Sequence, residues 1–156
     1  MKTNQLLART RKQDNKTQTL KEHTLQTTNI AASKIYNPTI KKCVELAGIL
    51  HDMGKVQDRF QSKLKGKNYR VRHAFLGAKY LDKDILDANT PNLFRAIQFM
   101  VEGHHSGLKD IDKYVNNIND AIEEVGENNL YPFVMKFLEN IKLKEDMDRL
   151  DQIITS

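Results

Sequence analysis

LAGILHDMGK, at residues 46–55, places His51 and Asp52 side by side at the end of an apolar run, with Gly54 and Lys55 close behind. An imidazole nitrogen and a carboxylate oxygen are ligand types that hold divalent first-row metal ions. The glycine is able to end a helix, and the lysine could reach an anionic substrate at the same ion. The stretch therefore indicates a metal site, although a His-Asp pair near a helix end can also be a simple hydrogen bond.

The remaining histidines favour the metal site. The chain has five histidines, and the other four are His23, His73, His104 and His105. A lone histidine on a helix is more often a packing or surface residue than a ligand. His104 and His105, however, are adjacent, follow an apolar helical pattern and precede a Ser-Gly pair that could turn both imidazoles toward one ion. We therefore interpret all five histidines and Asp52 as candidate ligands.

The motif His51-Asp52-x-Gly54-Lys55, in its apolar setting, resembles that of the HD superfamily of metal-dependent phosphohydrolases. Three further segments narrow the resemblance: EHTL at 22–25, RHA at 72–74 and GHHSGL at 103–108. Their order and spacing are similar to those of the HD nuclease domain of the CRISPR type I effector nuclease-helicase, which in some systems is a separate small protein. The resemblance covers residues 18–108 and includes every histidine of the chain.

The resemblance implies a centre with two divalent transition-metal ions. The first ion would be held by His23, His51 and Asp52. The second would be held by Asp52, His73, His104 and His105. Imidazole-rich ligation favours Mn, Fe, Co or Ni, with Mg as an alternative. Asp52 and Lys55 would be the catalytic residues, and the lysine would neutralise the scissile phosphate. The implied activity is endonucleolytic or exonucleolytic hydrolysis of single-stranded DNA in CRISPR interference, an antiviral defence.

The resemblance also implies partners. A nuclease of this kind works with a helicase that feeds the strand and with the RNA-guided complex that exposes it. The chain carries neither a Gly-x-x-x-x-Gly-Lys-Ser/Thr loop nor an Asp-Glu-x-His box. The helicase is therefore expected on another chain or on a segment removed from this one.

One part of the family pattern has no clear counterpart. The resembled nucleases carry a further metal-binding aspartate on a late, apolar helix, far beyond the paired histidines. Asp146, Asp148 and Asp151 lie in a charged segment, which is more typical of a solvated helix face. The chain either lacks this ligand, as a shortened form would, or supplies it from one of these three aspartates.

Length and composition indicate one domain in a reducing compartment. The chain of 156 residues is long enough to bury one hydrophobic core. Cys43 is the only cysteine, which excludes an intramolecular disulfide. No apolar run approaches the length of a membrane span, and the first residues lack the hydrophobic centre of a signal peptide. We expect a cytoplasmic protein with no membrane partner.

The charge is distributed unevenly along the chain. Residues 1–83 carry 18 basic and 6 acidic side chains, whereas residues 84–156 carry 7 basic and 14 acidic ones. The densest basic stretch, residues 55–83, lies between the His-Asp pair and the adjacent His104 and His105. A basic surface beside a metal site favours a polyanion such as nucleic acid. The candidate nucleic-acid contacts are Lys55, Lys63, Lys65, Lys67, Tyr69 and Arg70.

Apolar periodicity predicts an all-α fold. The resemblance implies that this fold is an HD-type helical bundle with the metal site between helices. We expect a basic arm at residues 1–17, a nuclease domain at residues 18–156 and no strands. Helices are predicted at 18–36, 39–52, 56–64, 71–86, 91–102, 110–125, 132–143 and 144–154. Thr39 is the expected N-cap of the second helix, His73 lies in the first turn of the fourth, and residues 65–68 form a turn. Tyr131-Pro132 is expected to break the chain between two helices.

Other functions remain compatible with these residues. An HD-type phosphohydrolase acting on nucleotides or other small phosphoesters would use the same His-Asp centre, but it rarely needs the second histidine cluster or so basic a flank. An HD-type cyclic-dinucleotide phosphodiesterase is disfavoured because the chain contains no Gly-Tyr-Pro. A non-catalytic nucleic-acid-binding HD module would bind DNA strongly without metal-dependent cleavage.

Overall fold

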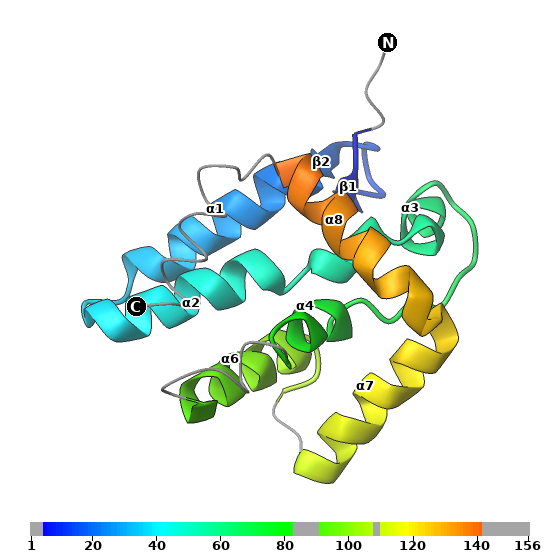
Figure 1. Ribbon diagram of the computed structural model, residues 1–156. Coiled ribbons are helices and arrows are strands. Elements are labelled where there is room, and N and C mark those ends of the chain that lie inside the picture. Colours follow the sequence, from blue (N-terminus) through cyan, green and yellow to red (C-terminus); the bar gives the residue numbers. More distant parts are fainter. Residues whose placement is uncertain (1–4, 83–90, 108–109, 142–156) are drawn as a thin grey trace.

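The structure is a computed structural model that describes residues 5–82, 91–107 and 110–141. Helices dominate these ranges (Figure 1), so the predicted all-α class is confirmed. In chain order the elements are β1 (Leu7–Thr10), β2 (Thr17–Thr19), α1 (Leu20–Ser33), α2 (Pro38–Leu50), η1 (Met53–Val56), α3 (Asp58–Leu64), α4 (Phe75–Tyr80), α6 (Pro91–Gly103), α7 (Ile111–Val125), η2 (Glu127–Asn129) and α8 (Leu130–Ile141).

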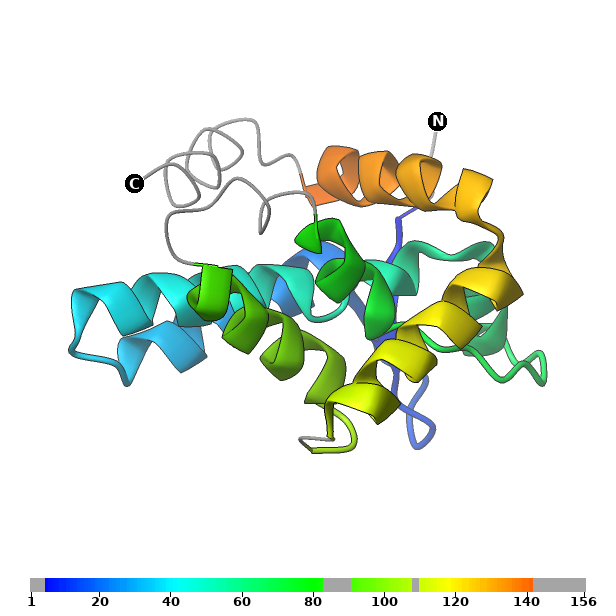
Figure 2. The ribbon, with the colours of Figure 1, turned by 60° about the horizontal axis from the view of Figure 1, so that its bottom comes forward.

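The helix α2 lies at the centre of the packing. It contacts α1 along an antiparallel hairpin and also contacts α6, while α4 packs against α6 and η1. In both ribbon views α3 and α7 lie at the end opposite to the turn between α1 and α2 (Figures 1 and 2). The core is fully buried at Leu46, Leu50, Met53, Leu76 and Phe137. None of the helices in the described ranges is both long and apolar enough to cross a membrane.

The first two helices begin at side-chain caps. Thr19 and Glu22 form a reciprocal capping box at the start of α1. The second helix starts at Pro38, and the Oδ1 atom of Asn37 accepts hydrogen bonds from the backbone N–H groups of Thr39 and Ile40. The prediction of Thr39 as the N-cap was therefore wrong by two residues. Asn37 takes that position because proline needs no amide partner at the first helical residue.

Other predicted boundaries also differ from the structure. The helix expected at 56–64 begins only at Asp58, because Val56 is the last residue of η1, and the helix expected from residue 71 begins only at Phe75. His73 therefore lies in an irregular segment before a helix and not in its first turn. Tyr131-Pro132 does not break the chain, because it lies in the first turn of α8, where proline is tolerated. The end of the fourth predicted helix, after residue 82, lies outside the described residues. The whole helix predicted at 144–154 also lies outside them.

The segment predicted as a basic arm forms an antiparallel β-hairpin, β1 with β2, that packs on the helices. Leu6 and Ala8 are part of the hydrophobic core. The Gln61 side chain accepts a hydrogen bond from the backbone N–H of Leu7 and donates one to its carbonyl oxygen, at 3.0 and 2.9 Å. Because Gln61 also donates to the carbonyl oxygen of Lys55, the hairpin is linked to the segment that carries the His-Asp motif. The expectation of no strands was wrong for this hairpin.

Candidate metal centre

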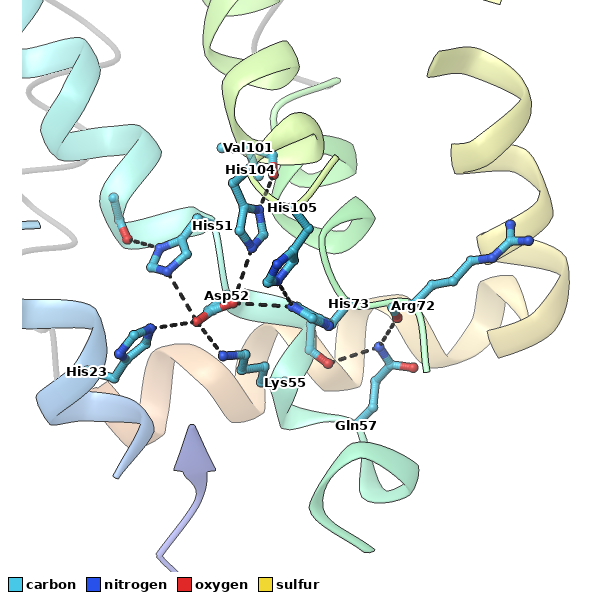
Figure 3. A network of polar contacts seen from close by, with 12 residues as sticks. His23, His51, Asp52, Lys55, Gln57, Arg72, His73, Val101, His104 and His105 are labelled. Carbon is cyan, nitrogen blue, oxygen red and sulfur yellow. Dashed lines mark hydrogen bonds and ion pairs between the residues drawn. The ribbon is translucent and has the colours of Figure 1, made fainter. Parts of the chain in front are cut away.

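The six predicted ligands come from four separate parts of the fold and meet at one point (Figure 3). His23 is on α1, and the His-Asp pair follows the last residue of α2. His73 lies in the segment before α4, and the paired histidines directly follow α6. The ligand atoms form two groups that share Asp52. The first group is His23, His51 and Asp52, and the second is Asp52, His73, His104 and His105.

One oxygen of the Asp52 carboxylate faces the first group. Its Oδ2 atom lies 2.9 Å from Nε2 of His23, 3.1 Å from Nε2 of His51 and 2.7 Å from Nζ of Lys55. Asp52 is 1 % exposed and Lys55 is 8 % exposed, so this cluster of charges is almost entirely removed from solvent. Lys55 is therefore part of the centre itself, and its catalytic role stays a prediction.

The other oxygen of Asp52 faces the second group. Its Oδ1 atom lies 3.4 Å from Nε2 of His73 and 3.5 Å from Nε2 of His104, and Nε2 of His73 lies 2.8 Å from Nε2 of His105. Oδ1 is buried and accepts no hydrogen bond in the described part of the chain. An orphaned buried carboxylate oxygen is costly unless something pairs with it. A cation among these atoms would pair with it, so the residues present fit a metal ion.

The backbone leaves the helical conformation just after α2, and both side chains of the His-Asp pair therefore face the metal centre. Neighbouring residues on a regular helix point about 100° apart, which would separate the two side chains. His51 keeps a helical backbone, with φ −56° and ψ −35°, whereas Asp52 has φ −111° and ψ 14°. The pair was predicted on the last turn of the helix, but the helix ends at Leu50. The change in backbone at Asp52 lets its carboxylate face the neighbouring imidazole.

Two of the histidines are held in place by the same kind of local contact, between Nδ1 and a backbone carbonyl oxygen. Nδ1 of His51 lies 2.6 Å from the carbonyl oxygen of Gly48, and Nδ1 of His104 lies 2.6 Å from that of Val101. In each case the histidine is three residues beyond a carbonyl left free at a helix end. If Nδ1–H donates to the carbonyl, the lone pair of Nε2 is directed at Asp52 and at any ion beside it.

The glycine of the motif permits a close backbone contact. A Cβ atom at Gly54 would overlap the carbonyl group of His73. Its φ angle is not positive, so it is not needed for an unusual backbone conformation. The sequence suggested that this glycine ends a helix, but in the structure it allows the segment carrying His73 to pass directly over η1. Gly77 has a similar role, because a Cβ there would overlap the carbonyl oxygen of Leu50.

Sequence analysis missed Gln57. This side chain is 4 % exposed, and its Nε2 donates hydrogen bonds of 2.9 Å to the carbonyl oxygens of both Gly54 and Arg72. It therefore joins the turn after Asp52 to the residue before His73. A single glutamine after an apolar run carries no signal of this role in the sequence, because its two partners are brought together only by the fold.

The electrostatics of the centre favour metal binding. Burial alone would raise the pKa of the Asp52 carboxyl, but the four imidazoles that face it hold that pKa well below its usual range. Desolvation, and then the neighbouring His104 and His73, lower the pKa of His105 to about 4. At neutral pH Asp52 is thus ionised and His105 is neutral. These are the protonation states that a metal ligand requires.

The predicted nucleic-acid contacts other than Lys55 lie outside the cluster. Lys63, Lys65, Lys67 and Arg70 are exposed, in α3 and in the segment that follows it. Tyr69 is half-buried, and the guanidinium of Arg59 lies 5.1 Å from its ring centroid. A stacking partner would therefore compete with Arg59 for the covered face of this ring. The candidate late aspartates Asp146, Asp148 and Asp151 lie outside the described residues.

Comparison with known proteins places the chain in a family. The HD domain family matches residues 20–153, a range that contains all six predicted ligands and the three late aspartates. No curated protein and no solved structure gave a match. HD domains are in general metal-dependent hydrolases of phosphate esters, and the two groups around Asp52 could hold such metals. This chain, with its His-Asp pair at the meeting point of four chain segments, belongs to the HD domain family.

Proposed function

We propose that this protein is a metal-dependent nuclease that hydrolyses phosphodiester bonds of single-stranded DNA. The observation that carries the proposal is the position of Asp52, whose two oxygens face two different groups of imidazoles. Two ions held by such a set would activate a water molecule and stabilise the charge that develops on the phosphate and the leaving oxygen. A carboxylate shared by both groups is what such a pair of ions requires.

The residues of the chain would have distinct roles. The imidazoles of His51 and His104 are already oriented by backbone carbonyls, so little reorganisation would accompany metal binding. Lys55 adds a buried positive charge 2.7 Å from Asp52. As a compact point charge, its ammonium group would neutralise an oxygen of the phosphate being cleaved.

The basic segment after the motif favours a polynucleotide over a small phosphoester. The exposed Lys63, Lys65, Lys67 and Arg70 extend the positive charge well away from the metal ligands. A single phosphate bound at the centre could not reach all of them, whereas a strand carries one phosphate for each nucleotide. Such cations bind a polyanion through the release of its counterions.

We further propose that the protein acts in CRISPR interference, with a helicase on another chain or on a removed segment and with an RNA-guided complex. This context is supported by the order and spacing of the five histidines in the sequence. It implies that the strand must be exposed before it is cut. Duplex DNA should therefore be a much poorer substrate for the protein alone than the same sequence as a single strand.

Cleavage assays test the proposal. Labelled single-stranded DNA should be degraded in the presence of Mn²⁺ or another transition metal, and EDTA should stop the reaction. Asp52→Asn, which keeps the size of the side chain and removes its charge, should lower the rate by at least about 100-fold. Hydrolysis of free nucleotides with DNA left intact would instead support a small-phosphoester hydrolase. Tight DNA binding without cleavage under any metal would support a binding module.

A further inference from the structure

Two cavities adjoin at the second group of metal ligands. One, of about 370 Å³, has His73 and His105 in its wall. The other, of about 530 Å³, lies between α3 and the α7–α8 region. Both are lined by the same three residues, 70–72. Figure 3 shows the side chain of Arg72 extending from the metal centre toward α7. The larger cavity therefore lies next to the smaller one, which reaches the metal centre, and residues 70–72 form the wall between them.

The larger cavity has unbalanced positive charge. Four cationic side chains and two carboxylates line it. One carboxylate, Asp58, pairs with Lys136 at 2.7 Å, and the other, Glu124, lies 3.6 Å from the guanidinium of Arg72. Within the ranges that the structure describes, Arg59 and Arg70 form no ion pair. Two exposed guanidinium groups are thus left to bind an anion at the mouth of the cavity.

An unused hydrogen-bond donor points to the same kind of ligand. The Nη1 atom of Arg72 is buried and has no hydrogen-bond partner among the described residues, although Asp120 lies 3.6 Å away. A buried guanidinium nitrogen without a partner is costly, and a phosphate oxygen would satisfy it. The remaining wall of the cavity is largely apolar, with Val71, Val125 and Phe133. An anion-binding edge beside an apolar wall suits a nucleotide, which has a phosphate at one end and a flat base at the other.

We propose that the larger cavity binds the nucleotide that adjoins the scissile phosphate of a single strand. The phosphate of this nucleotide contacts Arg59, Arg70 and Arg72, and its base lies against Phe133. This subsite rests on the proposed nuclease function and specifies how a strand, and not a free nucleotide, is selected. The wall between the two cavities is tied to the metal centre, because Gln57 donates hydrogen bonds to the carbonyl oxygens of both Arg72 and Gly54. A strand of two or more nucleotides can occupy both cavities, whereas a mononucleotide can occupy only one.

Binding to the whole 156-residue chain, free of metal, tests this subsite without any cleavage. Fluorescently labelled mononucleotide, dinucleotide and six-nucleotide DNA would be titrated in EDTA against the wild type and Arg59→Gln/Arg70→Gln. The dinucleotide should bind at least about tenfold more tightly than the mononucleotide, and the double variant should remove most of this gain, since each charged hydrogen bond is worth a factor of roughly ten or more. Lys34→Gln/Lys41→Gln is the matched control, because it removes two exposed positive charges near the turn between α1 and α2, at the opposite end of the molecule.

Each outcome has a distinct meaning. Equal loss of dinucleotide binding in the two double variants would show that only overall charge matters and would overturn the subsite. Equal affinity of the mononucleotide and the dinucleotide for the wild type would also overturn it. If the arginine variant alone loses dinucleotide binding, the subsite is supported, whether or not the protein cleaves DNA in the assays with added metal. A failure of cleavage would count against the nuclease function and not against the cavity.

Discussion

Asp52→Ala should empty both groups of metal ligands at once. Each oxygen of this carboxylate faces a different group, so its removal takes one ligand from each and leaves two cations close together with less negative charge between them. Affinity should fall by more than about 100-fold at both positions. The metal-free variant should also be less stable, by about 3–5 kcal/mol, because Lys55 would remain buried without its counter-ion.

Metal analysis after equilibration with Mn²⁺, combined with urea unfolding in EDTA, measures both effects. His73→Ala provides the contrast, because His73 belongs to the second group only. This variant should lose one ion and keep the other. Circular dichroism would check that the helices of each variant are intact. If Asp52→Ala retained as much metal as His73→Ala, the carboxylate would not be shared between the two groups.

Gly54→Ala should disturb the second group of ligands while leaving the first in place. The added Cβ would overlap the carbonyl group of His73, and a backbone atom cannot move aside as a flexible side chain does. Displacement of this segment should cost about 1–3 kcal/mol of stability. It should also weaken binding of the second ion, because the His73 imidazole moves with its backbone. Urea unfolding and metal titration of the same sample report the two effects.

Gly66→Ala is the matched control for that substitution. Gly66 has a φ of 96° and nothing within 4 Å of the position of a Cβ, so alanine there is strained by its backbone alone. The strain should cost roughly 1–2 kcal/mol without altering metal binding. Loss of the second ion from both glycine variants would show that general destabilisation, and not the contact with His73, is responsible.

The sequence predicted which residues gather around Asp52 better than it predicted the course of the backbone around them. The two groups found around Asp52 are those that the family resemblance implied, and together they contain every histidine of the chain. The position of His73 relative to the nearby helix was harder to predict. Val71, Phe75 and Ala78 have helical spacing, but the helix starts only at Phe75. Gln57 holds the carbonyl oxygen of Arg72, and this tertiary contact prevails over local periodicity.

The N-terminal hairpin shows a second limit of local patterns. Its strands contain four and three residues, too few for a reliable alternation of apolar and polar side chains. Besides the burial of Leu6 and Ala8, the side chain of Gln61 holds β1 on the domain, and it lies 54 residues from Leu7 in the sequence. A contact over that separation has no local signal. The role of Gly54 was missed for the same reason, because the carbonyl group it accommodates belongs to a residue in another segment.

The number of ions bound by each chain tests the account most directly. Metal-free protein would be titrated with Mn²⁺, and bound ions would be counted while cleavage of single-stranded DNA is followed in the same samples. We predict two ions per chain, with cleavage appearing only as the second is bound, since both groups around Asp52 would then be filled. One ion per chain at saturation, or cleavage that persists in EDTA, would contradict a centre in which Asp52 joins two metal sites.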